Sequence, residues 1–204
     1  GSQNLSATFT PTDTANYTTA TANVTLTVNK AAASVALSNL AQAYDAAPKA
    51  ASASTTPSGL SVTFSYSGTS GTVYGPSATA PTGAGSYSVT GAINDSNYSG
   101  SGSGTLTVNK AAPSISWATP AAITYGTTLS GGQLNATANV PGNFVYAPAA
   151  GTVLNAGSQN LSVTFTPTDT TDYTTATANV TLTVSKAAAS VALGNLAQTY
   201  DAAP

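Results

Sequence analysis

The sequence predicts an all-β protein built from small two-layer β-sandwich modules. Three observations lead to this prediction: the composition, the alternation of apolar and polar residues, and internal repetition. The chain is rich in Thr, Ser, Val and Tyr and lacks Glu, Arg and Met. No stretch keeps the i, i+3, i+4, i+7 apolar spacing of an amphipathic helix, so strands are expected throughout.

Charged residues are scarce and make up only 5% of the chain, against roughly 25% in an average domain. The chain contains four Lys and six Asp, so its net charge is −2. Nucleic-acid binding needs clustered Lys or Arg, so we expect no nucleic-acid partner. No apolar run is long enough to cross a bilayer, so we expect no membrane span in this segment. Ser and Thr, 61 residues together, take the solvent-facing role instead.

The chain repeats with a period of 156 residues, because residues 1–48 recur at 157–204 with only six differences. A shorter string, T-L-T-V-[N/S]-K-A-A, occurs at 25–32, 105–112 and 181–188. We therefore expect two alternating module types. The predicted division is the end of a second-type module at 1–30, a first-type module at 31–110, a second-type module at 111–186, and the start of another first-type module at 187–204.

Each module contains short runs in which every second residue is apolar, which is typical of a strand with one buried face. In the first type the inward residues are Val35, Leu37, Val62, Phe64, Tyr66, Tyr87, Val89, Ile93, Leu106 and Val108. In the second type they are Ile115, Trp117, Leu134, Ala136, Ala138, Val140, Phe144, Tyr146, Leu161, Val163, Phe165, Val180, Leu182 and Val184. About seven strands in such a module is the immunoglobulin-like pattern.

A Tyr follows an Asp-containing turn before each last strand, at Tyr17, Tyr98 and Tyr173. We interpret these as structural tyrosine corners, in which the ring is buried and the hydroxyl bonds to nearby backbone. Trp117 follows a junction, and we expect it to cover the interface with the preceding module. The run Gly100–Gly104, with Gly at every second position, is interpreted as a loose start of a strand.

The sequence resembles the bacterial Ig-like repeats called MBG-type and YDG-type. The resemblance lies in Tyr44-Asp45-Ala46-Ala47, in Tyr125-Gly126-Thr127-Thr128, and in the stretch from Asn155 to Ala187. Ala46 stands where the YDG pattern has Gly. These repeats occur in large surface adhesins and secreted multi-repeat proteins, so the resemblance implies an Ig-like fold and an extracellular or cell-surface location. It implies no catalytic or binding residues.

Catalytic chemistry finds no support in the residues. His and Cys are absent, so no Ser-His-Asp or Cys-His site exists, and we expect no enzyme and no cofactor. Asp13, Asp169 and Asp172 are candidate calcium ligands, since calcium prefers several oxygen ligands. The other interpretation is that these carboxylates cap the turn before the Tyr. Asn16 replaces Asp172 in the other copy.

Lys30, Lys110 and Lys186 precede Ala-Ala at each junction. They are either solvated charges that mark the linkers or partners in Lys–Asn crosslinks. We expect a structural segment of a long extracellular bacterial protein, a stalk or fibre whose partners are its neighbouring modules. Self-association into filaments is a further expectation, because few charges oppose it. The alternative is an adhesive module that binds glycan or a cell surface.

Overall fold

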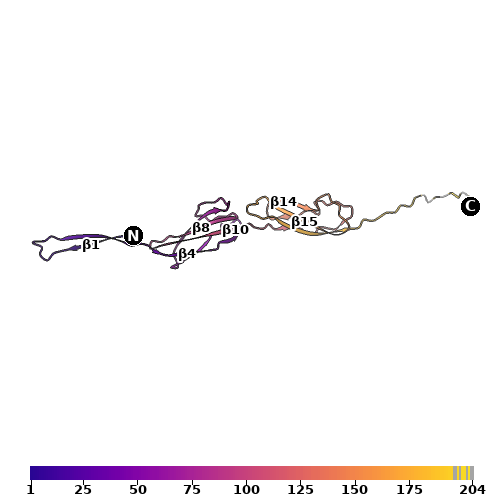
Figure 1. The fold of residues 1–204 in the computed structure, drawn as a ribbon. Helices are drawn as coiled ribbons and strands as arrows, with labels where there is room; N and C mark the ends of the chain where they lie inside the picture. The colour runs from indigo at the N-terminus through magenta and orange to yellow at the C-terminus, as the bar shows by residue number, and fades with distance from the viewer. Residues whose placement is uncertain (195–196, 198, 201, 203–204) are drawn as a thin grey trace. The chain divides into compact units, whose positions relative to one another are not determined.

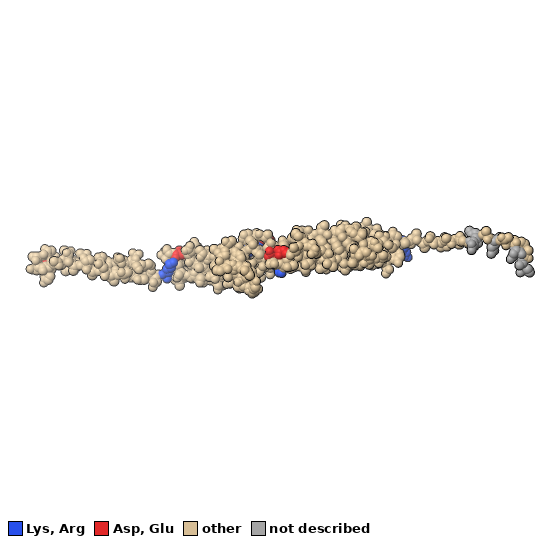
Figure 2. All heavy atoms as spheres, turned by 90° about the horizontal axis from the view of Figure 1, so that it is seen from above, with Lys and Arg blue, Asp and Glu red and all other residues tan. Residues whose placement is uncertain are grey.

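The computed structural model describes residues 1–194, 197, 199, 200 and 202, and every element in this part of the chain is a β-strand. The predicted all-β fold is confirmed. The chain divides into two compact units, Gly1–Ala111 and Ala112–Pro204. On the face drawn in Figure 2 only a few basic and acidic side chains are visible.

The first-type module places two sheets face to face. Its strands are β3 (Ala31–Ala32), β4 (Ser34–Ser38), β5 (Ala41–Ala43), β6 (Ser52–Thr56), β7 (Val62–Thr69), β8 (Gly85–Ile93), β9 (Tyr98–Ser99) and β10 (Ser101–Asn109). The main sheet has the order β5-β10-β8-β7, and β4 pairs with β6 in the second sheet (Figure 1). The short strand β3 pairs in parallel with β9.

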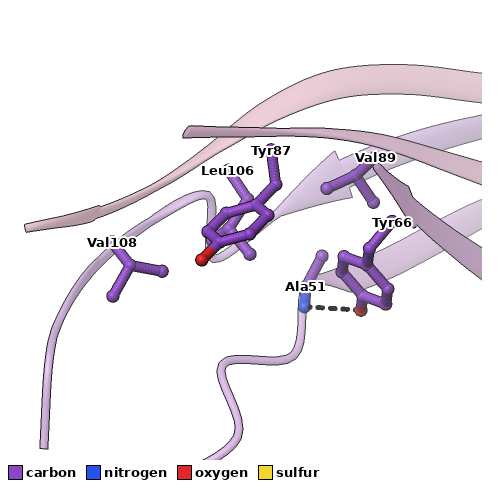
Figure 3. Packing of buried hydrophobic residues seen from close by; sticks show 6 residues of the cluster. All are labelled: Ala51, Tyr66, Tyr87, Val89, Leu106 and Val108. Carbon is purple, nitrogen blue, oxygen red and sulfur yellow. Dashed lines mark hydrogen bonds between the residues drawn. The ribbon is translucent and has the colours of Figure 1, made fainter. Parts of the chain in front are cut away.

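The core of this module consists of small aliphatic and tyrosine side chains. Its buried members are Ala51, Tyr66, Tyr87, Val89, Leu106 and Val108 (Figure 3). The phenol oxygen of Tyr66 accepts a hydrogen bond from the Ala51 backbone N–H at 3.1 Å, which keeps a buried polar atom satisfied. Leu37 of β4 packs against this cluster and links the two sheets.

Alternate glycines of β10 let another segment of the module lie unusually close. A Cβ atom on Gly102 would come within 2.3 Å of the Val35 carbonyl oxygen, and one on Gly100 within 1.9 Å of the Ala33 oxygen. From Ser101 onward the strand pairs regularly with β8. The run begins a strand, as expected, and Gly100 and Gly102 are needed there because a side chain at either position would collide with backbone.

The second-type module has a four-stranded sheet with the order β12-β16-β15-β14. Its strands are β11 (Ile115–Ser116), β12 (Ile123–Thr124), β13 (Thr137–Ala138), β14 (Gly142–Ala147), β15 (Gly157–Pro167) and β16 (Ala176–Ser185). The core holds Leu129, Leu154, Leu161, Leu182 and Val184. As predicted, the inward residues of β15 and β16 include the most buried side chains of the module.

The strand expected over 134–140 is much shorter than predicted. Only Thr137–Ala138 form strand β13, which pairs with β11. A turn precedes it, in which the N–H groups of Gln133 and Leu134 both donate to the Ser130 carbonyl. The apolar spacing of Leu134 and Ala136 thus reflects packing of an irregular segment against the core.

Residues 1–30 form a two-stranded hairpin of β1 (Ser2–Phe9) and β2 (Ala20–Thr27), labelled at β1 in Figure 1. Every residue of the two strands is exposed. The structure assigns no strand to 187–194, and residues 195, 196, 198, 201, 203 and 204 lie outside the described part. The expected start of a new module at 187–204 therefore stays a prediction.

Candidate functional site

Both modules pair an early strand with the last strand in parallel. In the first type, β5 lies parallel to β10, and the flanking bonds run from Thr107 N to Leu40 O at 2.8 Å and from Tyr44 N to Asn109 O at 2.9 Å. In the second type, β12 lies parallel to β16. We call each such pair the parallel clamp of its module.

The parallel clamp has a mechanical consequence. When a chain is pulled at its two ends, the early strand is drawn toward its N-terminus and the last strand toward its C-terminus. Because the two strands run in the same direction, these forces act in opposite senses along one shared axis. The hydrogen bonds of the clamp are thus loaded together in shear.

The chain that enters the first-type module is tied to the turn before its last strand. Lys30 Nζ donates to the Asp95 carbonyl at 2.6 Å, and the Ala31 N–H donates to the Asn97 carbonyl at 2.7 Å. The Ala33 N–H donates to the Ser99 carbonyl at 2.9 Å. Lys30 thus has a backbone partner, and Lys30, Lys110 and Lys186 are all exposed. A Lys–Asn crosslink at these positions stays a prediction that intact mass would test.

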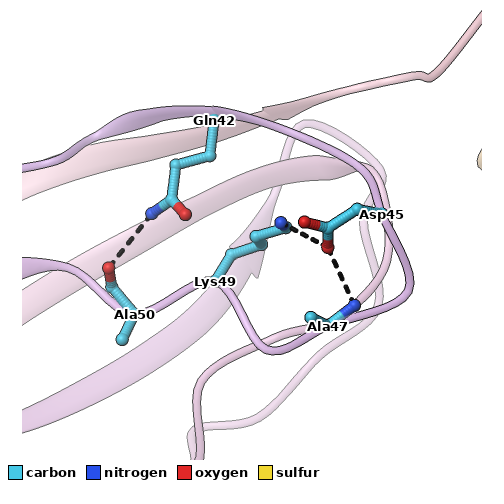
Figure 4. Close-up of polar contacts among 5 residues, drawn as sticks. All are labelled: Gln42, Asp45, Ala47, Lys49 and Ala50. Atoms are coloured by element: carbon cyan, nitrogen blue, oxygen red, sulfur yellow. Dashed lines mark hydrogen bonds and ion pairs between the residues drawn. The ribbon is translucent and has the colours of Figure 1, made fainter.

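The resemblance motif beginning at Tyr44 forms a closed turn next to the clamp (Figure 4). Asp45 forms an ion pair with Lys49, and its Oδ1 accepts the Ala47 N–H at 2.9 Å. Lys49 is only 7% exposed, so its aliphatic stem is packed while its ammonium group meets the carboxylate. Ala46 has φ = 65°, a left-handed conformation that explains why the YDG pattern has Gly there.

The Lys49 ammonium group lowers the pKa of Asp45, and the hydrogen bond from the Ala47 N–H lowers it further. Around this turn Asn39 and Gln42 donate side-chain N–H groups to the Ala50 carbonyl at 3.0 Å. Figure 4 shows the Gln42 bond lying beside the ion pair. The polar side chains are occupied in fixing the turn, and their arrangement offers structural rigidity rather than a reactive group.

Of the candidate calcium ligands, Asp169 and Asp172 lie in one turn and Asp13 lies in another. Asp169 Oδ1 accepts the N–H groups of Thr171 and Asp172, at 3.0 and 3.1 Å. Asp13 accepts from the side chain and backbone of Asn16, which lowers the Asp13 pKa. These are turn-capping contacts. Within the described residues no three acidic side chains come together around one point, and calcium binding stays a prediction that titration would test.

The three predicted corner tyrosines differ in exposure. Tyr17 is 67% exposed, whereas Tyr98 and Tyr173 are half-buried. Tyr87, near the start of β8, makes the kind of hydrogen bond expected of a tyrosine corner: its hydroxyl donates to the nearby Gly83 carbonyl at 2.7 Å. Sequence reasoning placed Tyr87 in the core and missed this bond. The Asp-containing turn in the sequence pointed to Tyr98 instead. The role of Tyr98 as a tyrosine corner stays a prediction.

Trp117 packs inside its own module. Its Nε1–H donates to the Gln133 carbonyl at 3.0 Å, and its ring meets the edge of Tyr146 at a centroid distance of 5.4 Å. Trp117 also packs against the leucine core. These contacts fix the irregular segment before β13. The predicted role of Trp117 at the interface with the preceding module stays a prediction.

Closed cores, capped turns and parallel clamps define the class of this protein as a β-sandwich module. Residues 33–112 match the MBG domain family, as the sequence resemblance predicted. Domains of this family are structural repeats of bacterial surface proteins and are not known as enzymes. The curated proteins contain no match to the chain. In the described residues no helix is long and apolar enough to cross a membrane.

Proposed function

We propose that this chain is a tension-bearing repeat segment of a long extracellular bacterial protein, acting as a stalk or fibre. The observation that carries the proposal is the parallel clamp, which occurs in two modules of different sequence. A module in which an early strand and the last strand are bonded in shear is suited to transmit force along a chain. The match of residues 33–112 to a structural repeat family supports the same role.

The bonds at the start of the first-type module strengthen the proposal. Because Lys30, Ala31 and Ala33 are all bonded to the segment 95–99, little slack remains between the hairpin and the module. A stalk needs short connections of this kind, since each loose linker would lengthen before the modules carry load. Neighbouring modules of the same protein are therefore the proposed partners.

Immunogold electron microscopy of cells that make the native protein tests this function. Antibodies against the two units should label extended material outside the cell envelope, at many points along its length. Labelling confined to the cytoplasm, or to compact particles, would refute a stalk or fibre. Parallel labelling with serum that was first absorbed with the 204-residue chain provides the control.

One observation favours the alternative function, an adhesive module that binds glycan. A hollow of about 370 Å³ at one end of the second-type module is lined by Tyr125, Asn155, Ala156, Lys186 and Ala187. Tyr125 is half exposed, and an exposed ring beside amide and ammonium groups has the chemistry of a sugar-stacking site. Glycan-array binding that disappears in Tyr125→Ala would support adhesion. If no glycan binds at high array density, the adhesive function is refuted and the structural role is the remaining candidate.

A further inference from the structure

Strand β7 of the first-type module and strand β14 of the second-type module hold equivalent places at the edge of a four-stranded sheet. Each strand contains a Phe-x-Tyr sequence, Phe-Ser-Tyr at 64–66 and Phe-Val-Tyr at 144–146. The two rings stack at a centroid distance of 6.2 Å in β7 and 6.3 Å in β14. In each strand the Tyr hydroxyl accepts a backbone N–H, from Ala51 in the first type and from Ala136 in the second. The two edges can therefore be compared residue by residue.

The first-type module covers the second half of the outer edge of β7 with its own chain. Tyr66 and Ser77 exchange both of their backbone hydrogen bonds in an antiparallel bridge, at 2.8 and 2.9 Å. The Gly68 N–H donates to the Tyr74 carbonyl at 2.8 Å. On the face turned away from the core, the residue between the two stacked rings is Ser65, which is exposed. The structure thus shows which kind of partner this edge takes, namely an antiparallel segment.

The second-type module leaves the equivalent edge of β14 open. The Thr168 N–H donates to the Pro141 carbonyl next to the ladder of β14 and β15, which fixes the bonding phase of that ladder. Because bonding alternates along an antiparallel pair, Val145 bonds to β15, whereas the backbone groups of Phe144 and Tyr146 point to the outer edge. In the part of the chain that the structure describes, no strand pairs with that edge.

An exposed apolar side chain lies beside the open edge. Val145 is 68% exposed and occupies the position that Ser65 holds in β7. No residue from 141 to 148 is charged, so β14 lacks the Lys that often protects an edge strand from pairing. Of the other edge strands, β5 and β12 are very short and β6 contains no large apolar residue. Strand β14 therefore combines an open ladder with an apolar contact residue.

We propose that β14 pairs edge to edge, in antiparallel orientation, with β14 of a second copy of this chain. An antiparallel pair of identical strands is related by a twofold axis, so each outward donor meets an outward acceptor. With the axis at Val145, Phe144 bonds to Tyr146 of the second copy and the two Val145 side chains lie directly opposite each other. The lack of charge lets identical strands meet without repulsion. This lateral contact goes beyond the tension-bearing role, which stands without it.

The contact of a single module is expected to be weak. It consists of a few backbone hydrogen bonds and one pair of valine side chains, and the 204-residue chain contains β14 once. We therefore expect this chain to be mostly monomeric in dilute solution. In the proposed stalk the second-type module recurs, and several weak contacts between two parallel stalks would add up. The experiments on the single chain must accordingly detect a transient contact.

Single-cysteine variants of the full chain trap such a contact, because the chain has no Cys of its own. A directly opposed pair without mutual hydrogen bonds brings its Cα atoms to about 4.5 Å, which a disulfide can span. With dissolved oxygen as oxidant, Val145→Cys should form disulfide-linked dimers roughly tenfold faster than Ser65→Cys, the equivalent exposed position beside a covered edge. Equal rates for the two variants would overturn the proposal.

A mixing experiment tests the orientation of the two strands. In the proposed register Asn143 of one copy lies opposite Ala147 of the other. An equimolar mixture of Asn143→Cys and Ala147→Cys should therefore give mainly the mixed dimer, which mass spectrometry separates from the two dimers of a single variant. A statistical mixture of all three dimers would contradict antiparallel pairing in this register, because it reports random collision.

Amide hydrogen exchange of the unmodified chain gives a readout without a covalent trap. The N–H groups of Phe144 and Tyr146 should exchange more slowly as the chain concentration rises. The Tyr66 N–H, which is bonded to Ser77, should be protected at every concentration and serves as the internal control. Protection of Phe144 and Tyr146 that does not change with concentration would overturn the proposal, because their edge would then be covered within one chain.

A charge at the centre of the contact should abolish it. Val145→Lys brings two positive charges together across the twofold axis, so the concentration dependence of the exchange rates should disappear. Ser65→Lys adds the same charge at the equivalent position of the other module and should leave the concentration dependence intact. If both variants behave like the unmodified chain, pairing through β14 is refuted.

Discussion

At the scale of single residues, the turn from Tyr44 to Lys49 shows how backbone conformation dictates residue choice. Asp45 fixes the turn through Ala47 N–H and through Lys49, and between them Ala46 is held in the left-handed region. An L-residue in that region costs about 1–2 kcal/mol, which glycine avoids. The Asp-Ala sequence thus keeps the turn at some expense of stability.

Ala46→Gly should stabilise the first unit. Relief of the left-handed strain exceeds the extra entropy of glycine in the unfolded chain, and the net gain is about 0.5–1 kcal/mol. Thermal unfolding followed by circular dichroism should therefore show a higher Tm. Ala47→Gly is the matched control, because φ of Ala47 is not positive, and it should lower Tm. A fall of Tm in both variants would contradict the role assigned to Ala46.

The Asp45–Lys49 pair should make stability depend on pH in the acid range. The folded-state pKa of Asp45 lies below its ordinary value of 3.8. Its contribution is therefore fully present above about pH 4 and is lost as pH falls through the lower folded-state pKa. Melting curves between about pH 7 and pH 2 should show this loss. In Asp45→Asn the Tm should be lower at neutral pH and should fall less with acid; an unchanged acid response would exclude Asp45 as its source.

At the scale of elements, β10 shows that a glycine-rich strand can be rigid. Gly102, an inner position of its first half, faces the Val35 backbone oxygen, and Gly100, just before the strand, faces the Ala33 backbone oxygen. Side chains reappear inward only at Leu106 and Val108, where the facing layer leaves room for a core. The close backbone approach at the start of β10 and the packed core at its end together fix how the main sheet lies against the facing layer.

Gly102→Ala should destabilise the first unit by about 1–3 kcal/mol or more, because the new methyl group must displace the Val35 backbone. Ser103→Ala is the control on the exposed face of the same strand, and it should change stability by less than about 0.5 kcal/mol. Urea unfolding of both variants measures the difference. Equal effects would show that glycine is not required for close approach.

The sequence predicted those strands whose inner faces carry large apolar side chains. Phe64 and Tyr66 in β7, and Leu161 and Phe165 in β15, alternate strictly with Ser and Thr, so their inward faces could be predicted. Strand β6 contains only Ser, Ala and Thr, so its two faces do not differ in hydrophobicity and its inward face could not be predicted. The parallel clamps could not be predicted either, because β5 and β12 are too short to show a period and are defined by partners far along the chain.

At the scale of the whole molecule, the two module types differ in core composition but share the closing device. The first type builds its core partly from Tyr66 and Tyr87, whereas the second uses leucines. Both close the sandwich by pairing an early strand in parallel with the last strand. The proposed stalk role requires such a device in every module, because the weakest module would limit the force that an array transmits.

Single-molecule pulling of the 204-residue chain tests the shear clamp most directly, using two variants at Gln42. Gln42→Pro removes the backbone N–H from the middle of β5, whereas Gln42→Ala removes only the side-chain bonds to Asn39 and Ala50. We expect Gln42→Pro to lower the unfolding force of the first-type module strongly, while Gln42→Ala leaves that force nearly unchanged. Equal unfolding forces in Gln42→Pro and the unmodified chain would contradict the claim that parallel pairing carries the load.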